Sequence, residues 1–304
     1  MSVDLACGEL AFLDLTFAGL DALPRRGEER HAHDLLRSPG GGAITAIGAA
    51  RLGLTTVLVS PIGGDAEGDF LRAALAAEGV RWAGRTVARS AVTAVLPAEG
   101  ERTMATFDPG EEVTAAELAA VAPAAVVLSL PRLPLAPEGA AVYATVGDAE
   151  ARDGAAATSE LDDARALIVN EREAELLTGE PDAGTAARRL AERTPCAVVT
   201  IGAAGALAAA GDELIRAPGH PSIVAVDTTG AGDLFTAAYV WADRLGASLQ
   251  ERLTWAVLYA ALSVRVPTAV GGAVTQSALA EAGAQHGLAP PARRSPVLMK
   301  EEAR

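Results

Sequence analysis

Lysine and asparagine are almost missing from this chain of 304 residues, in which Lys300 is the only lysine and Asn170 the only asparagine. No Gly-Lys-Ser or Gly-Lys-Thr triplet is present, so the sequence excludes a P-loop, the site where a glycine-rich turn and a lysine bind nucleotide phosphates. A catalytic lysine that forms a Schiff base is disfavoured as well, because Lys300 lies in a Pro-flanked tail.

Positive charge and cysteine are also scarce. The chain has 25 Lys and Arg residues against 39 Asp and Glu residues, a formal net charge of -14. Such a surface repels anions, so neither nucleic acid nor an anionic membrane is expected as the main partner. Cys7 and Cys196 are too few for a disulfide framework, which favours a cytoplasmic location. The longest apolar run, near residues 119–130, contains Pro123 and is too short to span a membrane.

Aromatic residues make up 4% of the chain, whereas hydrophobic residues make up 50%. The core must therefore be built from Ala, Val and Leu, which suits helices packed on a parallel sheet. Strand-like segments near 125–130, 140–146, 166–169 and 197–201 alternate with helical segments. This alternation predicts parallel strands joined by right-handed crossovers. Because no internal repeat or long linker is present, residues 1–304 are predicted to form one α/β domain.

The most informative stretch is Asp227-Thr-Thr-Gly-Ala-Gly-Asp233. The apolar run 221–226 before it predicts a buried strand, and segment 234–245 after it predicts a helix, so the glycines belong to a turn that opens a helix. Backbone amides and the helix dipole at such a turn favour an anion, most naturally a phosphate in transfer. Asp233 could be only a favourable helix-end charge, but beside a phosphate we favour a base that deprotonates the attacking hydroxyl.

This stretch resembles the signature of the ribokinase-like (PfkB) carbohydrate kinase family. The resemblance implies that Asp233 is the catalytic base and that the backbone amides of Gly230, Ala231 and Gly232 form the anion hole. It implies a doubly wound, mostly parallel sheet flanked by helices, with a small β lid. The implied reaction moves the γ-phosphoryl group of ATP to a hydroxyl of a sugar or sugar-like small molecule. Weaker motifs extend the resemblance over roughly residues 5–282.

Acceptor-binding residues are expected near the N-terminus. A predicted opening strand, 5–15, carries Asp14 where the family has an Asp that binds sugar hydroxyls; Glu9 could be a second contact or merely exposed. The family also has a glycine-rich turn that binds sugar hydroxyls, and small residues let a ligand approach the backbone closely. In this chain the turn consists of Gly40, Gly41 and Gly42.

The helix that follows this turn departs from the family pattern. Family members place an Asn there, whereas this chain has Ile44, and Thr45 is the nearest polar residue. The identity of the sugar is therefore left open. Segments 16–38 and 85–108 correspond to the family's lid, and the second of them reads as a hairpin. His31 and His33 in the first are interpreted as lid surface, because no further His or Cys cluster completes a metal site.

A second strong match, Asn170-x-x-Glu173, follows a predicted strand. Both side chains point the same way from the first helical turn, and Glu173 is the candidate for holding water-coordinated Mg²⁺, with Asn170 on the nucleotide side. The same spacing is that of an N-cap with a capping-box Glu, which needs no ligand. Asp227 is a candidate, through its backbone, for a monovalent cation such as K⁺. Further nucleotide contacts implied by the resemblance are Thr200, Gly202, Gly205 and Gly272.

Other functions stay open. The chain could be a non-catalytic sugar- or nucleotide-binding regulator on the same fold, since polar residues on the substrate side are depleted, or a nucleoside kinase of the same family. A dehydrogenase is disfavoured because no Gly-x-Gly-x-x-Gly follows a strand. Asp233 argues for the kinase, because a binding protein has no need of a base facing phosphate. A homodimer is one of the assembly states left open.

Overall fold

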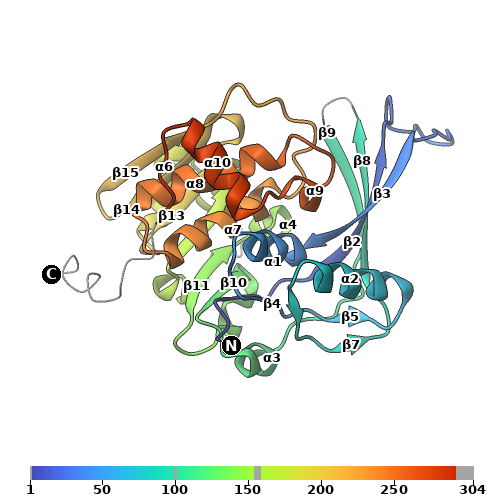
Figure 1. The fold of residues 1–304 in the computed structure, drawn as a ribbon, viewed down its shortest axis with the longest axis horizontal. Coiled ribbons are helices and arrows are strands. Elements are labelled where there is room, and N and C mark those ends of the chain that lie inside the picture. The colour runs from blue at the N-terminus through green and yellow to red at the C-terminus, as the bar shows by residue number, and fades with distance from the viewer. Residues whose placement is uncertain (1, 99–100, 154–158, 292–304) are drawn as a thin grey trace.

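The main body of the molecule is a sheet of nine strands covered by helices on both faces (Figure 1). The computed structural model describes residues 2–98, 101–153 and 159–291. From one edge to the other the strands are β15 (Glu213–Pro218), β14 (Gly205–Ala210), β13 (Ala197–Thr200), β12 (Ala166–Asn170), β11 (Ala141–Thr145), β10 (Ala125–Ser129), β1 (Leu5–Cys7), β4 (Thr56–Leu58) and β6 (Arg81–Trp82). All pair in parallel except β14, which is antiparallel to both neighbours.

Alternate residues of these strands face two different helical layers. Leu5 and Ile168 pack in a core cluster with the helices at 42–51, 231–244 and 249–263, whereas Ala6 and Leu167 pack in a second cluster with the helices at 115–121, 171–178 and 183–191. The predicted α/β fold with a mostly parallel sheet is therefore confirmed. The helices are α1 (Gly42–Arg51), α2 (Ala66–Ala77), α3 (Ala115–Val121), α4 (Asp148–Arg152), α5 (Glu171–Thr178), α6 (Ala183–Ala191), α7 (Ala231–Arg244), α8 (Leu249–Ser263), α9 (Ala269–Gly272) and α10 (Gln276–Gln285).

A second sheet projects from one side of the body (Figure 1). Its order is β3 (Asp34–Gly41), β2 (Ala11–Ala18), β8 (Ala91–Ala98) and β9 (Glu101–Phe107), and β2 is antiparallel to β3 but parallel to β8. The hairpin predicted in segment 85–108 is present as β8 and β9. Two short strands, β5 (Ile62–Gly63) and β7 (Thr86–Val87), form a separate pair. That the projecting sheet closes over a ligand stays a prediction.

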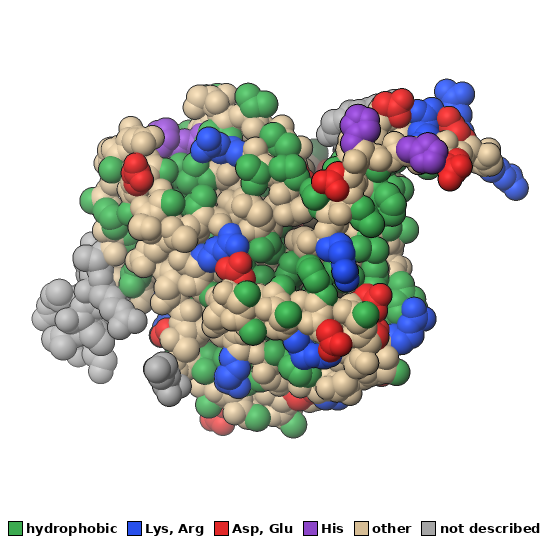
Figure 2. Space-filling view, turned by 45° about the vertical axis from the view of Figure 1, so that its right-hand side comes forward, with side chains coloured by type: hydrophobic (Ala, Val, Ile, Leu, Met, Phe, Trp, Pro, Cys, Tyr) green, Lys and Arg blue, Asp and Glu red, His purple; other side chains and the backbone are tan. Residues whose placement is uncertain are grey.

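Charged and histidine side chains gather on the loop between β2 and β3, at the end of the projecting sheet (Figure 2). His31 and His33 are both exposed there, as expected for this segment. They share a surface depression with acidic residues and one arginine, namely Asp21, Glu28, Glu29 and Arg30.

Two predicted strands differ from the structure. The opening strand 5–15 is two strands, since the chain leaves β1 after Cys7 and begins β2 at Ala11, in the other sheet. The predicted strand 221–226 is wrong, because this segment is irregular and leaves Val224 80% and Val226 62% exposed. The amides of Val226 and Asp227 instead donate to the carbonyl of Val264, at 2.6 and 3.2 Å, so the end of this segment is held against the C-cap of α8.

Three short 3-10 helices complete the described structure: η1 (Leu130–Leu135), η3 (Ser159–Asp163) and η4 (Gly202–Ala204). None of the helices in the described part of the chain has the length and apolar character that crossing a membrane requires.

Candidate active site

The predicted glycine turn opens α7, as the sequence indicates. Gly230 is the N-cap, in the left-handed conformation with φ 70°, and a methyl group there would lie 2.4 Å from Cβ of Ala269 and 2.9 Å from Cδ1 of Ile44. Both conditions require glycine at this position. The amide of Ala231 donates to the Thr228 carbonyl at 3.3 Å. The first amides of a helix have no partner within the helix, so this turn presents donors to an anion.

Asp233 lies in the first turn of α7 and lines a pocket of about 450 Å³. The hydroxyl of Thr45, in the first turn of α1, lies 3.3 Å from its Oδ1. The pocket is walled by the N-terminal turns of these two helices and by residues at the C-terminal ends of β10, β11, β12 and β13. Open α/β sheets bind their ligands at this edge.

The predicted acceptor residues divide into two groups. Gly41, Gly42 and Thr45 line the large pocket, whereas Asp14 and Gly40 lie outside its lining. Asp14 packs against Gly40, where a methyl group would lie 2.3 Å from its Oδ1. Burial raises the pKa of Asp14 to about 7, and the carboxylates of Asp233 and Asp227 add to this shift. Because the charge of Asp233 influences the pKa of Asp14, the two carboxyl groups lie in the same region of the molecule. Contact between Asp14 and an acceptor stays a prediction.

Asn170 and Glu173 both line the large pocket and also form a capping box. The Glu173 amide donates to Oδ1 of Asn170 at 2.9 Å, and the Asn170 amide donates to Oε2 of Glu173 at 2.9 Å. The capping box that the spacing allows is therefore present, but it uses only one carboxylate oxygen of Glu173, Oε2. Burial raises the pKa of Glu173 to about 7, against the lowering effect of the Asn170 amide.

The donor set for a metal ion is small. In residues 2–98, 101–153 and 159–291 there is no group of three or more His, Cys, Asp or Glu side chains that could hold a metal by themselves. Mg²⁺ commonly needs only one or two carboxylates, together with water and substrate phosphates. Glu173, with one carboxylate oxygen outside the cap, fits that pattern and does not fit a metal bound wholly by protein ligands.

A second pocket, of about 240 Å³, adjoins the first and shares Thr200 and Gly232 with it. Three of the predicted nucleotide residues, Thr200, Gly202 and Gly205, gather in its lining. Its other walls are mostly apolar and include Ile223, Phe235, Val257, Ala260 and Ala261. An apolar slot beside a helix N-terminus suits a planar base whose phosphates reach the turn at Gly232.

Four further predicted residues are absent from the lining of the large pocket, and three of these, like Asp14 and Gly40, line neither pocket. Gly230 lines neither pocket, and Ala231 lines only the smaller one. Gly272 is buried and lines neither pocket. The carboxylate of Asp227 accepts the amides of Thr229 at 2.8 Å and Thr268 at 2.9 Å, so it orders the loop that enters α7. A cation at Asp227 stays a prediction.

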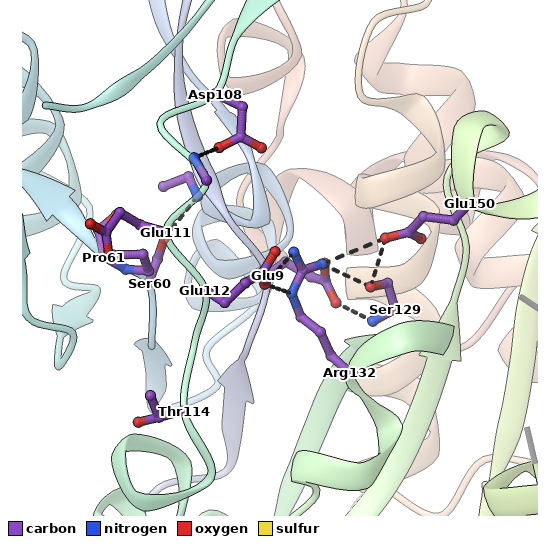
Figure 3. Close-up of polar contacts among 12 residues, drawn as sticks. Glu9, Ser60, Pro61, Asp108, Glu111, Glu112, Thr114, Ser129, Arg132 and Glu150 are labelled. Carbon is purple, nitrogen blue, oxygen red and sulfur yellow. Dashed lines mark hydrogen bonds and ion pairs between the residues drawn. The ribbon is translucent and has the colours of Figure 1, made fainter. Parts of the chain in front are cut away.

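Glu9 was left open between an acceptor contact and plain exposure, and the pocket residues around it were not among the predicted site residues. Glu9, Ser129, Arg132 and Glu150 lie together on one wall of the large pocket (Figure 3). Arg132 follows β10 in η1, and Glu150 follows β11 in α4. Each therefore lies in the helix that begins shortly after the C-terminal end of a strand, a position that marks the ligand-binding edge of such a sheet. That signal could have found them from the sequence.

Known proteins resemble this chain over most of its length. A model of the pfkB family of carbohydrate kinases matches residues 7–275. Ribokinase from Bacillus subtilis (strain 168) is 30% identical over 278 residues, covering 86% of this chain and 93% of that protein. Ribokinase from Mus musculus is 29% identical over 271 residues, covering 80% of this chain and 83% of that protein.

A solved structure resembles the fold of this chain over most of its length. Ribokinase from Arabidopsis thaliana, solved in complex with ribose and ATP, has a TM-score of 0.77 and 25% identity, covering 93% of this chain and 99% of that one. The predicted family, fold class and kinase activity are thereby confirmed. The chain belongs to the pfkB family of carbohydrate kinases and is an ATP-dependent enzyme that phosphorylates a sugar or sugar-like molecule.

Proposed function

We propose that this kinase uses Asp233 to deprotonate the acceptor hydroxyl while the turn at Gly230, Ala231 and Gly232 binds the transferred phosphoryl group. The observation that carries the proposal is the position of Asp233 in the large pocket, next to Gly232, which the two pockets share. A donor in the smaller pocket would direct its phosphates past Gly232. An acceptor in the larger pocket would then offer its hydroxyl to Asp233, in line with the transferred group.

Each group has one task in this reaction. Asp233 accepts the hydroxyl proton as the new O–P bond forms. The amides of the turn donate to the phosphoryl oxygens, where negative charge accumulates. The amide of Ala231 is held by the Thr228 carbonyl only at 3.3 Å, so a phosphoryl oxygen can compete for it. Closure of the lid would exclude water, which otherwise would accept the phosphoryl group.

We propose that Mg²⁺ is held by Glu173, with Asn170 beside it, and by the donor's phosphates. When bound, the ion neutralises phosphate charge. Glu173 supplies the carboxylate oxygen that the capping box leaves free. A monovalent cation such as K⁺ is assigned to the loop that Asp227 orders, through backbone carbonyl groups.

The acceptor is proposed to be a sugar-like molecule bound by Gly41, Gly42 and Thr45, with Asp14 and Gly40 beside it. Ile44 takes no part, because its side chain is 2% exposed and packs beneath Gly230. Segments 16–38 and 85–108 are proposed to act as the lid of a single domain. A cytoplasmic location agrees with two free, buried cysteines, Cys7 and Cys196. A homodimer can be tested by light scattering.

A phosphorylation screen tests this function. The enzyme is mixed with ATP and Mg²⁺, with and without K⁺, and products of neutral sugars, sugar acids and nucleosides are detected by mass spectrometry. Asp233→Asn should lower kcat by about 100- to 10,000-fold. Asp212→Asn, at an exposed position, is the matched control. Undiminished turnover in Asp233→Asn would refute the assigned base, and binding without turnover of any acceptor would favour a regulator.

A further inference from the structure

We propose that Glu9, held in place by Arg132, selects the acceptor: it binds hydroxyl groups of neutral acceptors and rejects acidic ones, both sugar acids and sugar phosphates. This inference rests on the kinase function proposed above. It assigns recognition of the acceptor to Glu9, just after the end of β1. From the sequence alone, contact of Glu9 with the acceptor and plain exposure to solvent were equally open.

Glu9 lies on the acceptor half of the large pocket. It follows β1 directly and borders the glycine turn, since a methyl group on Gly42 would lie 2.7 Å from Cβ of Glu9. The amide of Gly42 donates to the carbonyl of Leu10 at 2.9 Å, which fixes the turn against the same strand end. The Glu9 side chain remains 19% exposed and lines the pocket. An acceptor bound at Gly41 and Gly42 would therefore meet this carboxylate.

The carboxylate of Glu9 is held from two sides (Figure 3). Nη1 of Arg132 donates to Oε2 at 3.0 Å, and the amide of Ser129 donates to Oε1. Two donors use about half of the lone-pair positions of a carboxylate, so acceptor hydroxyls can still donate to it. A side chain fixed before the ligand arrives loses little conformational entropy on binding. Burial raises the pKa of Glu9, and Arg132 and the Ser129 amide act in the opposite direction.

The charge of Arg132 is already compensated. Its guanidinium lies 3.0 Å from Glu9, 2.8 Å from Glu112 and 3.6 Å from Glu150. Ser129 strengthens this group, because its hydroxyl donates to Glu150 at 3.1 Å and accepts from Arg132 at 2.8 Å. With three carboxylates around it, Arg132 has no unmatched positive charge to offer an acidic acceptor.

The rest of the pocket wall repels anions too. Among its described lining residues, Arg132 is the only Arg, Lys or His, whereas five are acidic: Glu9, Asp108, Glu150, Glu173 and Asp233. The donor's phosphates are met by the turn before α7 and by Mg²⁺, on the other half of the pocket. A carboxylate or phosphate on the acceptor would instead face Glu9, and like charges placed together without compensation cost several kcal/mol.

A purely structural role for Glu9 makes a different prediction. In that case Glu9 only ties the end of β1 to Ser129 and Arg132, and its loss would lower thermal stability without changing acceptor KM. If Glu9 instead recognises the acceptor, its replacement changes the acceptor KM and the preference between neutral and acidic acceptors. A purely structural contact would change neither. The two roles therefore separate in kinetics.

The test compares paired acceptors in the whole enzyme at about pH 8.5, which lies above the pKa of Glu9, raised by burial to about 8, so that most of this carboxyl is ionised. The pairs are ribose with ribonate, glucose with gluconate, and fructose with fructose 6-phosphate. The native enzyme should favour the neutral member by about 100-fold or more in kcat/KM. Glu9→Gln should raise the KM for the neutral member by about 10-fold with kcat little changed, and should narrow the preference to about 10-fold.

Three further variants locate the effect. Arg132→Met should raise acceptor KM as Glu9→Gln does, and the double variant should be no worse than either one, because both act through the same carboxylate. Glu9→Asp retains the charge and should still reject acidic acceptors, whatever its KM. Glu112→Gln is the matched control, because Glu112 touches the same guanidinium but is 61% exposed and outside the pocket lining. It should leave KM and preference unchanged.

The outcomes separate this inference from the kinase function. Turnover of neutral acceptors with unchanged KM and preference in Glu9→Gln would overturn the role of Glu9 and leave the function intact. A native enzyme that prefers the acidic member of any pair would overturn it as well. Failure of the native enzyme to phosphorylate any acceptor would instead remove the proposed function and this inference with it. Should Arg132→Met not fold, Arg132→Lys replaces it, since lysine keeps the charge but not the paired geometry.

Discussion

The hydroxyl of Thr45 lies 3.3 Å from Oδ1 of Asp233 and 3.4 Å from the backbone carbonyl oxygen of the same residue. The two residues are far apart in the sequence and meet because α1 and α7 pack with their N-terminal turns side by side. The orientation of the proposed base, Asp233, therefore depends in part on Thr45, which lies on α1, the helix that follows the turn at Gly40, Gly41 and Gly42. Acceptor binding and proton removal share one wall of the pocket.

Replacing Thr45 by Val should lower kcat by about 3- to 10-fold, because a net hydrogen bond contributes about 1 kcal/mol and the Asp233 carboxylate loses one of the contacts that orient it. Thr45→Ser retains the hydroxyl and should keep most of the activity. Steady-state kinetics with a saturating neutral acceptor measure both. Equal rates in the native enzyme and Thr45→Val would mean that the contact does not orient the base.

Two glycines of the turn that opens α7, Gly230 and Gly232, should respond differently to replacement by alanine. A methyl group on Gly232 meets no atom within 4 Å and would project into the shared part of the two pockets, so Gly232→Ala should fold normally and lose activity. Gly230→Ala forces a side chain into the left-handed region against Ala269 and Ile44, which should cost about 1–3 kcal/mol of stability.

Thermal unfolding and kinetics on both alanine variants separate these effects. Gly232→Ala should show a native-like Tm and a raised KM for ATP or a lowered kcat. Gly230→Ala should show a Tm several degrees lower. A stable Gly230→Ala enzyme would mean that the turn relaxes more than the packing at Ile44 suggests.

Stability of the ligand-free, Mg²⁺-free protein should fall as the pH rises from about 5 to about 8. Folding raises the pKa of Asp14 and of Glu173 from ordinary values of 3.8 and 4.5 to about 7 each. Between those values the folded state binds more protons than the unfolded state. Each group therefore stabilises the fold at low pH and loses that contribution as pH rises through about 7, by up to about 1.4 kcal/mol per pH unit.

Urea unfolding of the native protein, Asp14→Asn and Glu173→Gln at each pH isolates these contributions. Each variant should flatten the slope of stability against pH, because its amide cannot titrate. Glu112→Gln is again the control and should leave the slope unchanged. A native slope that rises with pH in this window, or variants that leave it unaltered, would contradict the prediction.

Asp243, on α7, should be required for stability. Its side chain is 1% exposed, and it binds Nη2 of Arg165 at 2.7 Å, Nη2 of Arg252 at 2.8 Å and the Tyr143 hydroxyl. Asp243→Ala leaves these donors without their carboxylate and should cost about 3–5 kcal/mol. Asp212→Ala, at an exposed position, should change stability by less than about 0.5 kcal/mol. Denaturant unfolding measures both, and a loss below about 1 kcal/mol in Asp243→Ala would mean that water replaces the carboxylate.

Predictions that depend on local chemistry agree with the structure. The turn at Gly230 is set by adjacent residues, and so is the capping box of Asn170 and Glu173, because helix capping involves only residues within one turn. The mostly parallel sheet follows from alternating apolar strands and helices. The error at 221–226 has a non-local cause: a short apolar run is compatible with a strand, but its hydrogen-bond partners lie far away in the sequence, and here they are the carbonyl of Val264 after α8.

The sequence by itself determined the order of strands and helices, the glycine turn and the acid beside it, because each depends on residues close together in the chain. Tertiary structure alone decided that Glu9 meets Arg132 and that Thr45 meets Asp233. Residues distant in the sequence come together only when neighbouring strands end at one edge of the sheet and two helices begin there. Side-chain periodicity defines which face of an element is buried, but it carries no information about which other element lies against that face.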